Sequence, residues 1–307
     1  FLLAIHKEKE KYGLALVDVS TGELLTSEGN LEQLLHIVGT FDPSEIIYQR
    51  RTELPSQLNN RSSFKLEDWA FQYNYAYEKL TNHFKTSSLK GFGVEDLKLG
   101  IIAAGAIFAY LVEDTHHALL QHITKIQIIP KEDYLMMDHF TLRNLEIVYS
   151  SHPQGKSLLD IVDKTSTPMG GRLLRRRLIL PLKSVNEINR RLDLVEFFNK
   201  EENLKYDILQ LLKSISDLDR LMGKVASEKI YPKEVGYLRQ SLINIQEIKK
   251  LLHPHDEVLT WLPPLINLDE LINYLKNYLN EELPVNISKG NVIKSGISEE
   301  LDHLRGL

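Results

Sequence analysis

The spacing of apolar residues changes near Trp69, and this change limits the possible folds more than any other feature of the sequence. Up to that point apolar and polar residues alternate, which is typical of half-buried strands. Beyond it apolar residues recur every three or four positions, which is typical of amphipathic helices. We therefore predict two domains, an α+β domain followed by an all-α domain. We place the boundary between residues 90 and 91, where Gly91 and Gly93 let the chain bend as it leaves the first domain.

The first domain, residues 1–90, is expected to contain a mixed sheet. Strands are predicted at residues 1–6, 13–20, 23–27, 45–49 and 64–69. Asn30 is a favoured N-cap residue and precedes a short amphipathic helix that ends near Val38. Three antiparallel strands followed by alternating helices and strands are typical of a ribonuclease-H-like sheet.

The second domain, residues 91–307, is expected to be elongated and helical. Residues 94–112 are apolar almost all round, which predicts a buried helix. Two longer helices near the end keep regular three- and four-residue spacing of leucine and isoleucine. In this domain helices are predicted at residues 94–112, 139–149, 157–164, 168–180, 185–199, 203–212, 217–227, 235–252 and 268–279, and a further helix, residues 73–84, is predicted near the end of the first domain.

The chain contains no cysteine. This excludes disulfides, thiolate zinc sites and cysteine nucleophiles, and it favours a reducing cytoplasm. No apolar run reaches the length of about 18 residues that a membrane helix needs, and the apolar residues 1–5 lack the basic segment of a secretory signal. The net charge of −5 argues against a chain whose main task is to coat phosphates. Because the sequence starts at Phe1 without a methionine, we expect a fragment of a longer protein.

One stretch imitates a phosphate-binding loop. Gly155, Lys156 and Ser157 match the end of that motif, but Ser150 stands where the loop needs a glycine, and Pro153 interrupts it. The residues before it are predicted to be helical, whereas the loop must follow a strand. We therefore predict a polar linker in which Ser157 caps the next helix.

Asp18 stands on a predicted strand where a ribonuclease-H-like nuclease would keep a catalytic carboxylate. Two-metal cleavage needs several convergent carboxylates, and Glu45 and Asp68 are the possible partners. A strand that ends in a turn explains Asp18 equally well. The histidines, including His116 and His117, form no His-Glu-x-x-His pattern, so we expect no metal site. A metal-dependent nuclease is the enzyme alternative.

Residues 141–183 hold eight lysines and arginines against three acidic residues. Arg172, Arg175 and Arg176 share one face of a helix that Pro168 opens. Such a face could contact a phosphate backbone. Because no aromatic residues are interleaved and the whole chain is acidic, the favoured interpretation is a solvated or salt-bridged face.

Several stretches across nearly the whole chain resemble sequence blocks of one known family, and they occur in the same order as in that family. They are residues 12–23 (YGLALVDVSTGE), 91–95 (GFGVE) with 103–106 (AAGA), 137–147 (MDHFTLRNLEI), 157–160 (SLLD), 167–174 (TPMGGRLL), 180–182 (LPL), 190–195 and 217–220 (DLDR). Together they resemble the MutS family of DNA mismatch repair proteins.

The resemblance implies the connector and lever regions of such a protein, cut before its clamp. These regions would lie between a mismatch-reading domain and an ATPase, and would transmit conformational change between them. The sequence holds neither the Phe-x-Glu motif of the reader nor a complete phosphate-binding loop. ATP, Mg²⁺, mismatched duplex DNA and a second subunit are therefore implied only for the parent protein. For this chain we expect no catalytic residue and no cofactor, and we assign no DNA-binding residue.

The resemblance also implies recruitment of MutL, and it points to the predicted helix 73–84. Glu78 and Lys79 resemble positions implicated in MutL contact, although a solvated face explains them equally well. The inward positions would be Tyr73, Tyr77, Leu80 and Phe84, and the outward positions Tyr75, Glu78, Asn82 and, toward one edge, Lys79. A helical adaptor unrelated to DNA is the second alternative function.

Overall fold

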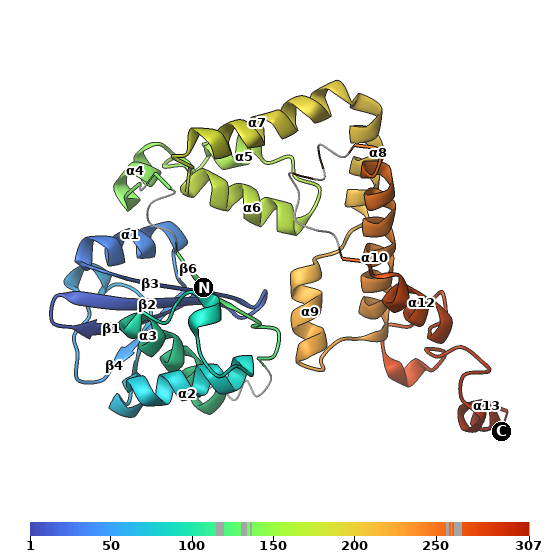
Figure 1. Cartoon of the computed structure of the whole chain (residues 1–307), viewed down its shortest axis with the longest axis horizontal. Helices are drawn as coiled ribbons and strands as arrows, with labels where there is room; N and C mark the ends of the chain where they lie inside the picture. The colour runs from blue at the N-terminus through green and yellow to red at the C-terminus, as the bar shows by residue number, and fades with distance from the viewer. Residues whose placement is uncertain are drawn as a thin grey trace. The chain divides into compact units, whose positions relative to one another are not determined.

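The structure is a computed structural model. The residues that it describes are 1–114, 120–129, 134–135, 137–255, 258, 260 and 266–306. His116 and His117 lie outside these residues. The chain divides into two compact units, residues 1–163 with 174–183 and residues 164–173 with 184–307, which we describe in turn (Figure 1). None of the helices in the described ranges is long and apolar enough to cross a membrane.

Six strands form one mixed sheet in the first unit, in the order β5-β4-β1-β2-β3-β6. The first three strands are antiparallel, and each of the others runs parallel to the strand that it joins. The strands are β1 (Leu2–Glu8), β2 (Lys11–Asp18), β3 (Glu23–Gly29), β4 (Glu45–Gln49), β5 (Ser63–Leu66) and β6 (Ile126–Ile128). The predicted ribonuclease-H-like sheet is confirmed. The sequence does not predict β6, because three residues are too few to show an alternating pattern.

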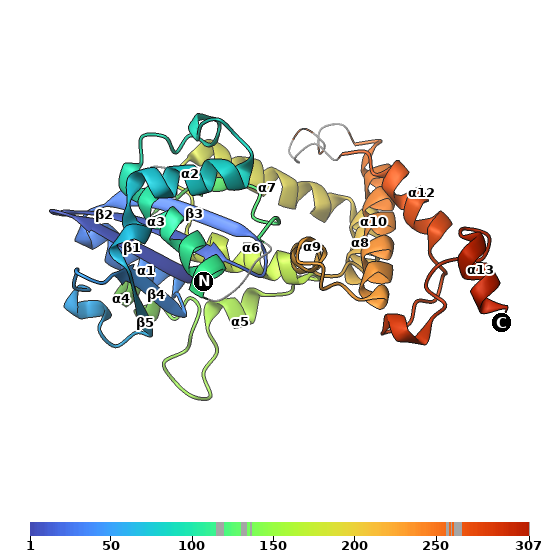
Figure 2. The ribbon, with the colours of Figure 1, turned by 90° about the horizontal axis from the view of Figure 1, so that it is seen from below.

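The sheet separates two hydrophobic cores, because successive side chains of a strand point to opposite faces. Leu3 of β1 packs in the core that α1 (Leu31–Phe41) covers. Ala4 packs in the core that α2 (Tyr73–Phe84) and α3 (Lys98–Ala109) cover. Figure 2 shows α1 and α2 on opposite sides of the sheet.

Helix α1 begins at the predicted residue. The Asn30 side chain accepts the backbone N–H of Gln33, and the Gln33 side chain accepts the backbone N–H of Asn30 at 3.2 Å, which is a capping box. The helix ends at Phe41, three residues beyond its predicted end, and the C-cap residue Asp42 has a left-handed backbone with φ of 45°. Arg61 donates to the Asp42 carboxylate at 2.7 Å and so holds this end of the helix.

Helix α3 is buried along almost its whole length, as its apolar circumference predicts. It packs against α2 and against β1, β2 and β3, so it belongs to the first unit. The predicted boundary at residue 90 therefore cuts through this unit. A helix that is apolar on every side needs cover from several elements, and here the sheet and α2 provide it.

The start of α3 is fixed at close range to β2 and β3. The Glu28 carboxylate accepts the backbone N–H groups of Leu99 and Gly100, at 3.1 Å for Gly100. At Gly13 of β2, a Cβ would lie 2.1 Å from the Leu99 carbonyl carbon and oxygen. Only a glycine at this position allows the strand and the helix backbone to approach so closely.

The remaining elements of the first unit are short. They are η1 (Ser56–Leu58), η2 (Asp68–Phe71), η3 (Lys90–Phe92), the π-helical turn η4 (Tyr110–Asp114), α4 (His139–Asn144), α5 (Leu158–Val162) and the second half of α6 (Pro168–Ile179). The helix predicted at 139–149 ends early because Glu146 adopts a left-handed backbone, with φ of 49°. Its carboxylate accepts the backbone N–H of Ser151 at 2.8 Å.

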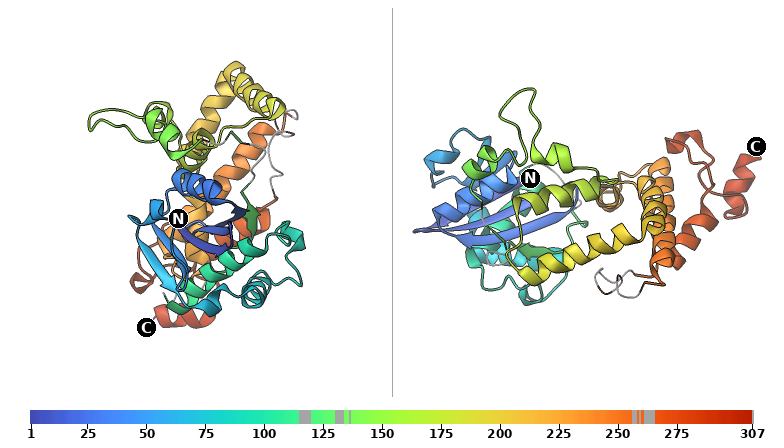
Figure 3. Two further views of the ribbon diagram at one scale, coloured as in Figure 1. Left: turned by 90° about the vertical axis from the view of Figure 1, so that its left-hand side faces the viewer. Right: turned by 90° about the horizontal axis from the view of Figure 1, so that it is seen from above.

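The second unit is helical, as predicted. Its elements are the first half of α6, α7 (Val185–Lys200), α8 (Glu202–Lys213), α9 (Leu218–Ala226), α10 (Pro232–Leu252), α12 (Asp269–Tyr278), η5 (Ile287–Lys289) and α13 (Glu299–Arg305). Helices α8 and α10 pack side by side (Figures 1 and 3). Ile208, Leu252 and Val258 form a small core, against which Leu194 and Phe197 of α7 pack.

Candidate functional site

Helix α2 buries one face and exposes the other. Ala76 and Leu80 lie at the centre of the buried face, where Gly105 of α3 allows the two helices to approach closely. On the opposite face Glu78 and Asn82 are exposed, as predicted. Asn74 is also exposed, and a helical spacing of four residues places it in line with them.

Tyr75 and Lys79 lie at the edge of this face and are half-buried. The edge position agrees with the prediction for Lys79, whereas Tyr75 was predicted to point fully outward. The Tyr75 ring meets the Trp69 ring edge-on, with 5.0 Å between their centroids. The Lys79 ammonium lies 5.5 Å from the Tyr75 ring centroid, within range of a cation–π contact. Of the predicted inward positions Tyr73, Tyr77, Leu80 and Phe84, Leu80 alone is buried, and Ala76 is the other buried residue of the helix. The buried face is therefore turned toward Tyr75 relative to the prediction.

A shallow hollow of about 210 Å³ adjoins the exposed face, lined by Tyr73, Asn74, Tyr77, Glu78 and Glu95. The Tyr77 hydroxyl donates to the Glu95 carboxylate at 2.9 Å, and the backbone N–H of Leu89 donates to the same carboxylate at 3.0 Å. Burial and the bond to Glu95 raise the pKa of Tyr77. Glu95 is thus a fixed negative group beside α2, which the helix periodicity did not reveal.

The carboxylates that a nuclease would need do not converge. Asp18 points to the α1 face of the sheet, as Leu16 does, whereas Glu45 points to the α3 face and accepts the Tyr110 hydroxyl at 3.0 Å. Asp68 follows the far end of β5 and accepts the side-chain amide of Gln49 at 3.1 Å. In the part of the chain that the structure describes, no three His, Asp or Glu residues could hold a metal ion.

The arginines of α6 are paired, as the favoured interpretation predicts. Within the second unit, Arg172 donates to Asp217 through both terminal nitrogens, at 2.7 and 2.8 Å, and to Asp219 at 2.8 Å. Within the first unit, Arg176 forms an ion pair with Glu23. Arg175 lies over the Tyr149 ring, 5.5 Å from its centroid.

Two family models match the chain in sequence order. Residues 1–124 match MutS domain II, and residues 140–305 match MutS domain III. The chain belongs to the MutS family. It is 46% identical over its whole length to the DNA mismatch repair protein MutS of Flavobacterium psychrophilum, and 42% identical over 99% of its length to that of Bacteroides thetaiotaomicron. The protein of the same name from Cytophaga hutchinsonii is 41% identical. The chain spans 36% of the length of each of these relatives.

In this MutS-family chain the loop-like motif at residues 154–157 caps a helix, as predicted. The Ser157 hydroxyl accepts the backbone N–H of Asp160 at 3.2 Å, and the Asp160 carboxylate accepts the backbone N–H of Ser157 at 2.9 Å. The motif follows α4 and a turn rather than a strand, and α5 is only five residues long. The Ser150 hydroxyl occupies the space beside Gly155. This arrangement lacks the strand and the long helix that cradle phosphates.

Lys156→Ala should therefore leave nucleotide titrations of this chain unchanged. Lys156 is exposed and caps no group of the fold, so the free energy of unfolding should also stay the same. Isothermal titration calorimetry with ATP and Mg²⁺ checks the first expectation, and chemical denaturation checks the second. Micromolar ATP binding that disappears in Lys156→Ala would contradict the interpretation as a helix cap.

Proposed function

We propose that this chain forms the connector and lever regions of a DNA mismatch repair protein. Its relatives over the whole length are named DNA mismatch repair protein MutS, which supports this role. A mixed-sheet unit followed by a helical unit is suited to a mechanical task, because packed helices have discrete arrangements. The chain would transmit conformational change between the ATPase, clamp and mismatch-reading domains of the parent protein.

The proposed task requires no covalent chemistry in this chain. ATP, Mg²⁺, mismatched duplex DNA and a second subunit would bind to other domains of the parent protein in the cytoplasm. The scattered positions of Asp18, Glu45 and Asp68 support this view over a metal-dependent nuclease, which needs convergent carboxylates.

The exposed face of α2 is the proposed docking site for MutL. Asn74, Glu78 and Asn82 are exposed in one row and held on a helix whose opposite face is buried. A rigid helix loses little conformational entropy when a partner binds. One edge of this face carries the Tyr75 ring, which contacts Trp69 and Lys79. Aromatic side chains of this kind are enriched at protein interfaces.

Reversing both charges, with Glu78→Lys and Lys79→Glu, in the full-length protein should weaken MutL recruitment by about tenfold or more. Mismatch binding and ATPase rates should survive, because α2 carries neither proposed activity. Surface plasmon resonance with immobilised MutL measures the first effect, and gel-shift and phosphate-release assays measure the others.

The adjacent pair Glu8 and Lys9 provides a matched control, since both side chains are exposed at the turn between β1 and β2. The double reversal Glu8→Lys with Lys9→Glu makes the same change in composition and should leave recruitment intact. Equal recruitment by the α2 variant and the unmodified protein would place the docking surface elsewhere.

A further inference from the structure

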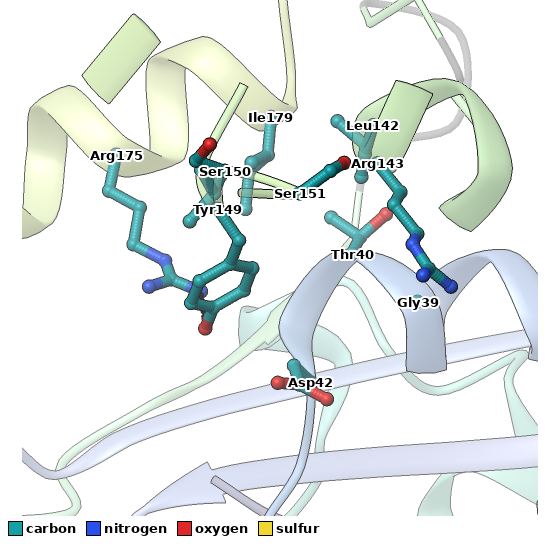
Figure 4. A pocket seen from close by; sticks show the side chains of 11 residues that line it. Gly39, Thr40, Asp42, Leu142, Arg143, Tyr149, Ser150, Ser151, Arg175 and Ile179 are labelled. Atoms are coloured by element: carbon teal, nitrogen blue, oxygen red, sulfur yellow. Dashed lines mark hydrogen bonds between the residues drawn. The ribbon is translucent and has the colours of Figure 1, made fainter. Parts of the chain in front are cut away.

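A cavity of about 350 Å³ lies within the first unit, on the α1 side of the sheet (Figure 4). Its walls come from the end of α1, from α4 and the segment after it, and from the second half of α6. They are formed by Gly39, Thr40, Asp42, Leu142, Arg143, Val148, Tyr149, Ser150, Ser151, Arg175 and Ile179. None of these side chains serves the proposed docking face on α2.

The lining combines apolar walls with a flat aromatic platform. Leu142 and Ile179 are buried side chains, and Val148 packs against the same core. Tyr149 is 61% exposed, so its ring is accessible to a ligand. Cavities of this size with mostly apolar walls and a few polar groups are typical of small-molecule sites.

Two guanidinium groups flank the cavity. Figure 4 shows Arg175 over the Tyr149 ring on one side and Arg143 on the other. Arg175 donates one hydrogen bond, to the Tyr149 hydroxyl at 3.2 Å. Arg143 is exposed, and its guanidinium forms no ion pair or hydrogen bond with any part of the chain that the structure describes. Most of the ten N–H donors of the two arginines are therefore available to a ligand.

The acidic groups near the cavity already have partners. The Asp42 carboxylate accepts from Arg61 at 2.7 Å, and that arginine also donates to the Pro43 carbonyl. Glu146 lies outside the lining, and the backbone N–H of Ser151 holds its carboxylate, which lowers the pKa of Glu146. The hydroxyl groups of Ser150 and Ser151 add polar atoms to the wall between the arginines.

We propose that this cavity binds a small organic anion with a flat apolar body. The body would lie against Leu142, Ile179 and the Tyr149 ring, and the anionic head would accept from Arg143. A phosphate monoester and a carboxylate share this chemistry, and a guanidinium can bind either through two parallel hydrogen bonds. Because α1 lies in the segment that matches domain II and α6 in the segment that matches domain III, such a ligand would contact both family segments at once.

Titration of the whole chain with phenyl phosphate, benzoate, phenol and inorganic phosphate tests the proposal. Calorimetry and saturation-transfer NMR should give a dissociation constant of about 0.1–1 mM for the preferred anion, as expected for a ligand of this size. Phenol lacks the charge and inorganic phosphate lacks the ring, so each should bind at least about tenfold more weakly than the preferred anion. The comparison of phenyl phosphate with benzoate identifies the head group.

Arg143→Gln should weaken binding of the preferred anion by about tenfold and leave phenol unaffected. Its fold should survive, because the guanidinium has no partner among the described residues. Lys156→Gln removes one exposed positive charge outside the cavity and should change the affinity by less than about twofold. Ser151→Phe places a ring at the cavity wall and should abolish binding of both aromatic anions.

Three outcomes would overturn the proposal. The first is the absence of saturable binding by any probe. The second is inorganic phosphate binding as tightly as phenyl phosphate, which would indicate only nonspecific attraction to positive charge. The third concerns a short DNA duplex that displaces phenyl phosphate from the unmodified chain at a concentration far below that of the phenyl phosphate. If the duplex did not do so with Arg143→Gln, this surface would be a nucleic-acid contact.

Discussion

Gly13→Ala should lower the free energy of unfolding of the first unit by about 3 kcal/mol. The new Cβ would lie 2.1 Å from the Leu99 carbonyl, a backbone group that cannot rotate away. Neither partner is free to retreat: β2 is hydrogen-bonded between β1 and β3, and the Glu28 carboxylate holds the start of α3. Urea denaturation measures the loss, followed by tryptophan fluorescence in a Trp261→Phe background, where Trp69 of this unit is the sole tryptophan.

Gly91→Ala is the matched control, because no atom lies within 4 Å of its added Cβ. It should change the free energy of unfolding by no more than about 0.5 kcal/mol. Equal free energies of unfolding for Gly13→Ala and Gly91→Ala would show that β2 and α3 do not approach each other so closely.

Arg172→Ala should destabilise the second unit by about 2–3 kcal/mol. The Arg172 side chain is 32% exposed and the Asp217 side chain 16%, so its removal leaves a partly buried carboxylate without its main partner. Arg172→Lys keeps the charge but not the two parallel hydrogen bonds, so it should recover only part of the loss. Thermal denaturation followed by circular dichroism measures all three proteins.

The effect of Arg172→Ala should depend on pH. The hydrogen bonds from Arg172 lower the pKa of Asp217 and outweigh burial, which acts in the opposite direction. A carboxyl whose pKa is lowered by folding stabilises the protein above its unfolded value of about 4, and this contribution is lost as the pH falls through the folded value. The difference in the free energy of unfolding between Arg172→Ala and the unmodified chain should therefore have its full size at pH 6 and should shrink below about pH 4.

Lys200→Ala breaks the ion pair between Lys200 and Glu196 on α7, in which both side chains are exposed. It should not measurably change the free energy of unfolding at either pH. A difference between Arg172→Ala and the unmodified chain that stayed constant down to pH 2 would show that lost packing, not the ion pair, causes the destabilisation.

Local sequence signals predicted most of the individual elements. The caps at Asn30 and Ser157 lie at the predicted residues, because a side chain and a backbone N–H three residues apart determine them. The boundary near residue 90 and the strand β6 depend on distant partners: α3 requires the sheet, and Ile126 requires Leu24 of β3. Periodicity within one segment carries no information about such pairs.

The same distinction applies to the candidate surfaces. The exposed positions Glu78 and Asn82 follow from helical spacing alone. Tyr75 was misplaced because Trp69, which precedes the helix, packs on its ring. Arg172 and Asp217 are 45 residues apart in sequence, and Arg143 and Tyr149 line one cavity with Thr40 only when the chain is folded. Their residue types suggested charge and aromatic character, whereas their arrangement required the tertiary structure.

The position of β1 and β2 between two cores has a consequence for hydrogen exchange. Leu3, Ala4, Leu14 and Ala15 are fully buried, and each strand is paired along both edges. Separation of α1 alone, or of α2 and α3 alone, would uncover one face and leave the backbone pairs of these strands in place. Their amide protons can therefore reach solvent only through opening of the whole unit. Their exchange rates would report the global stability of the first unit, independently of any helix that moves against it.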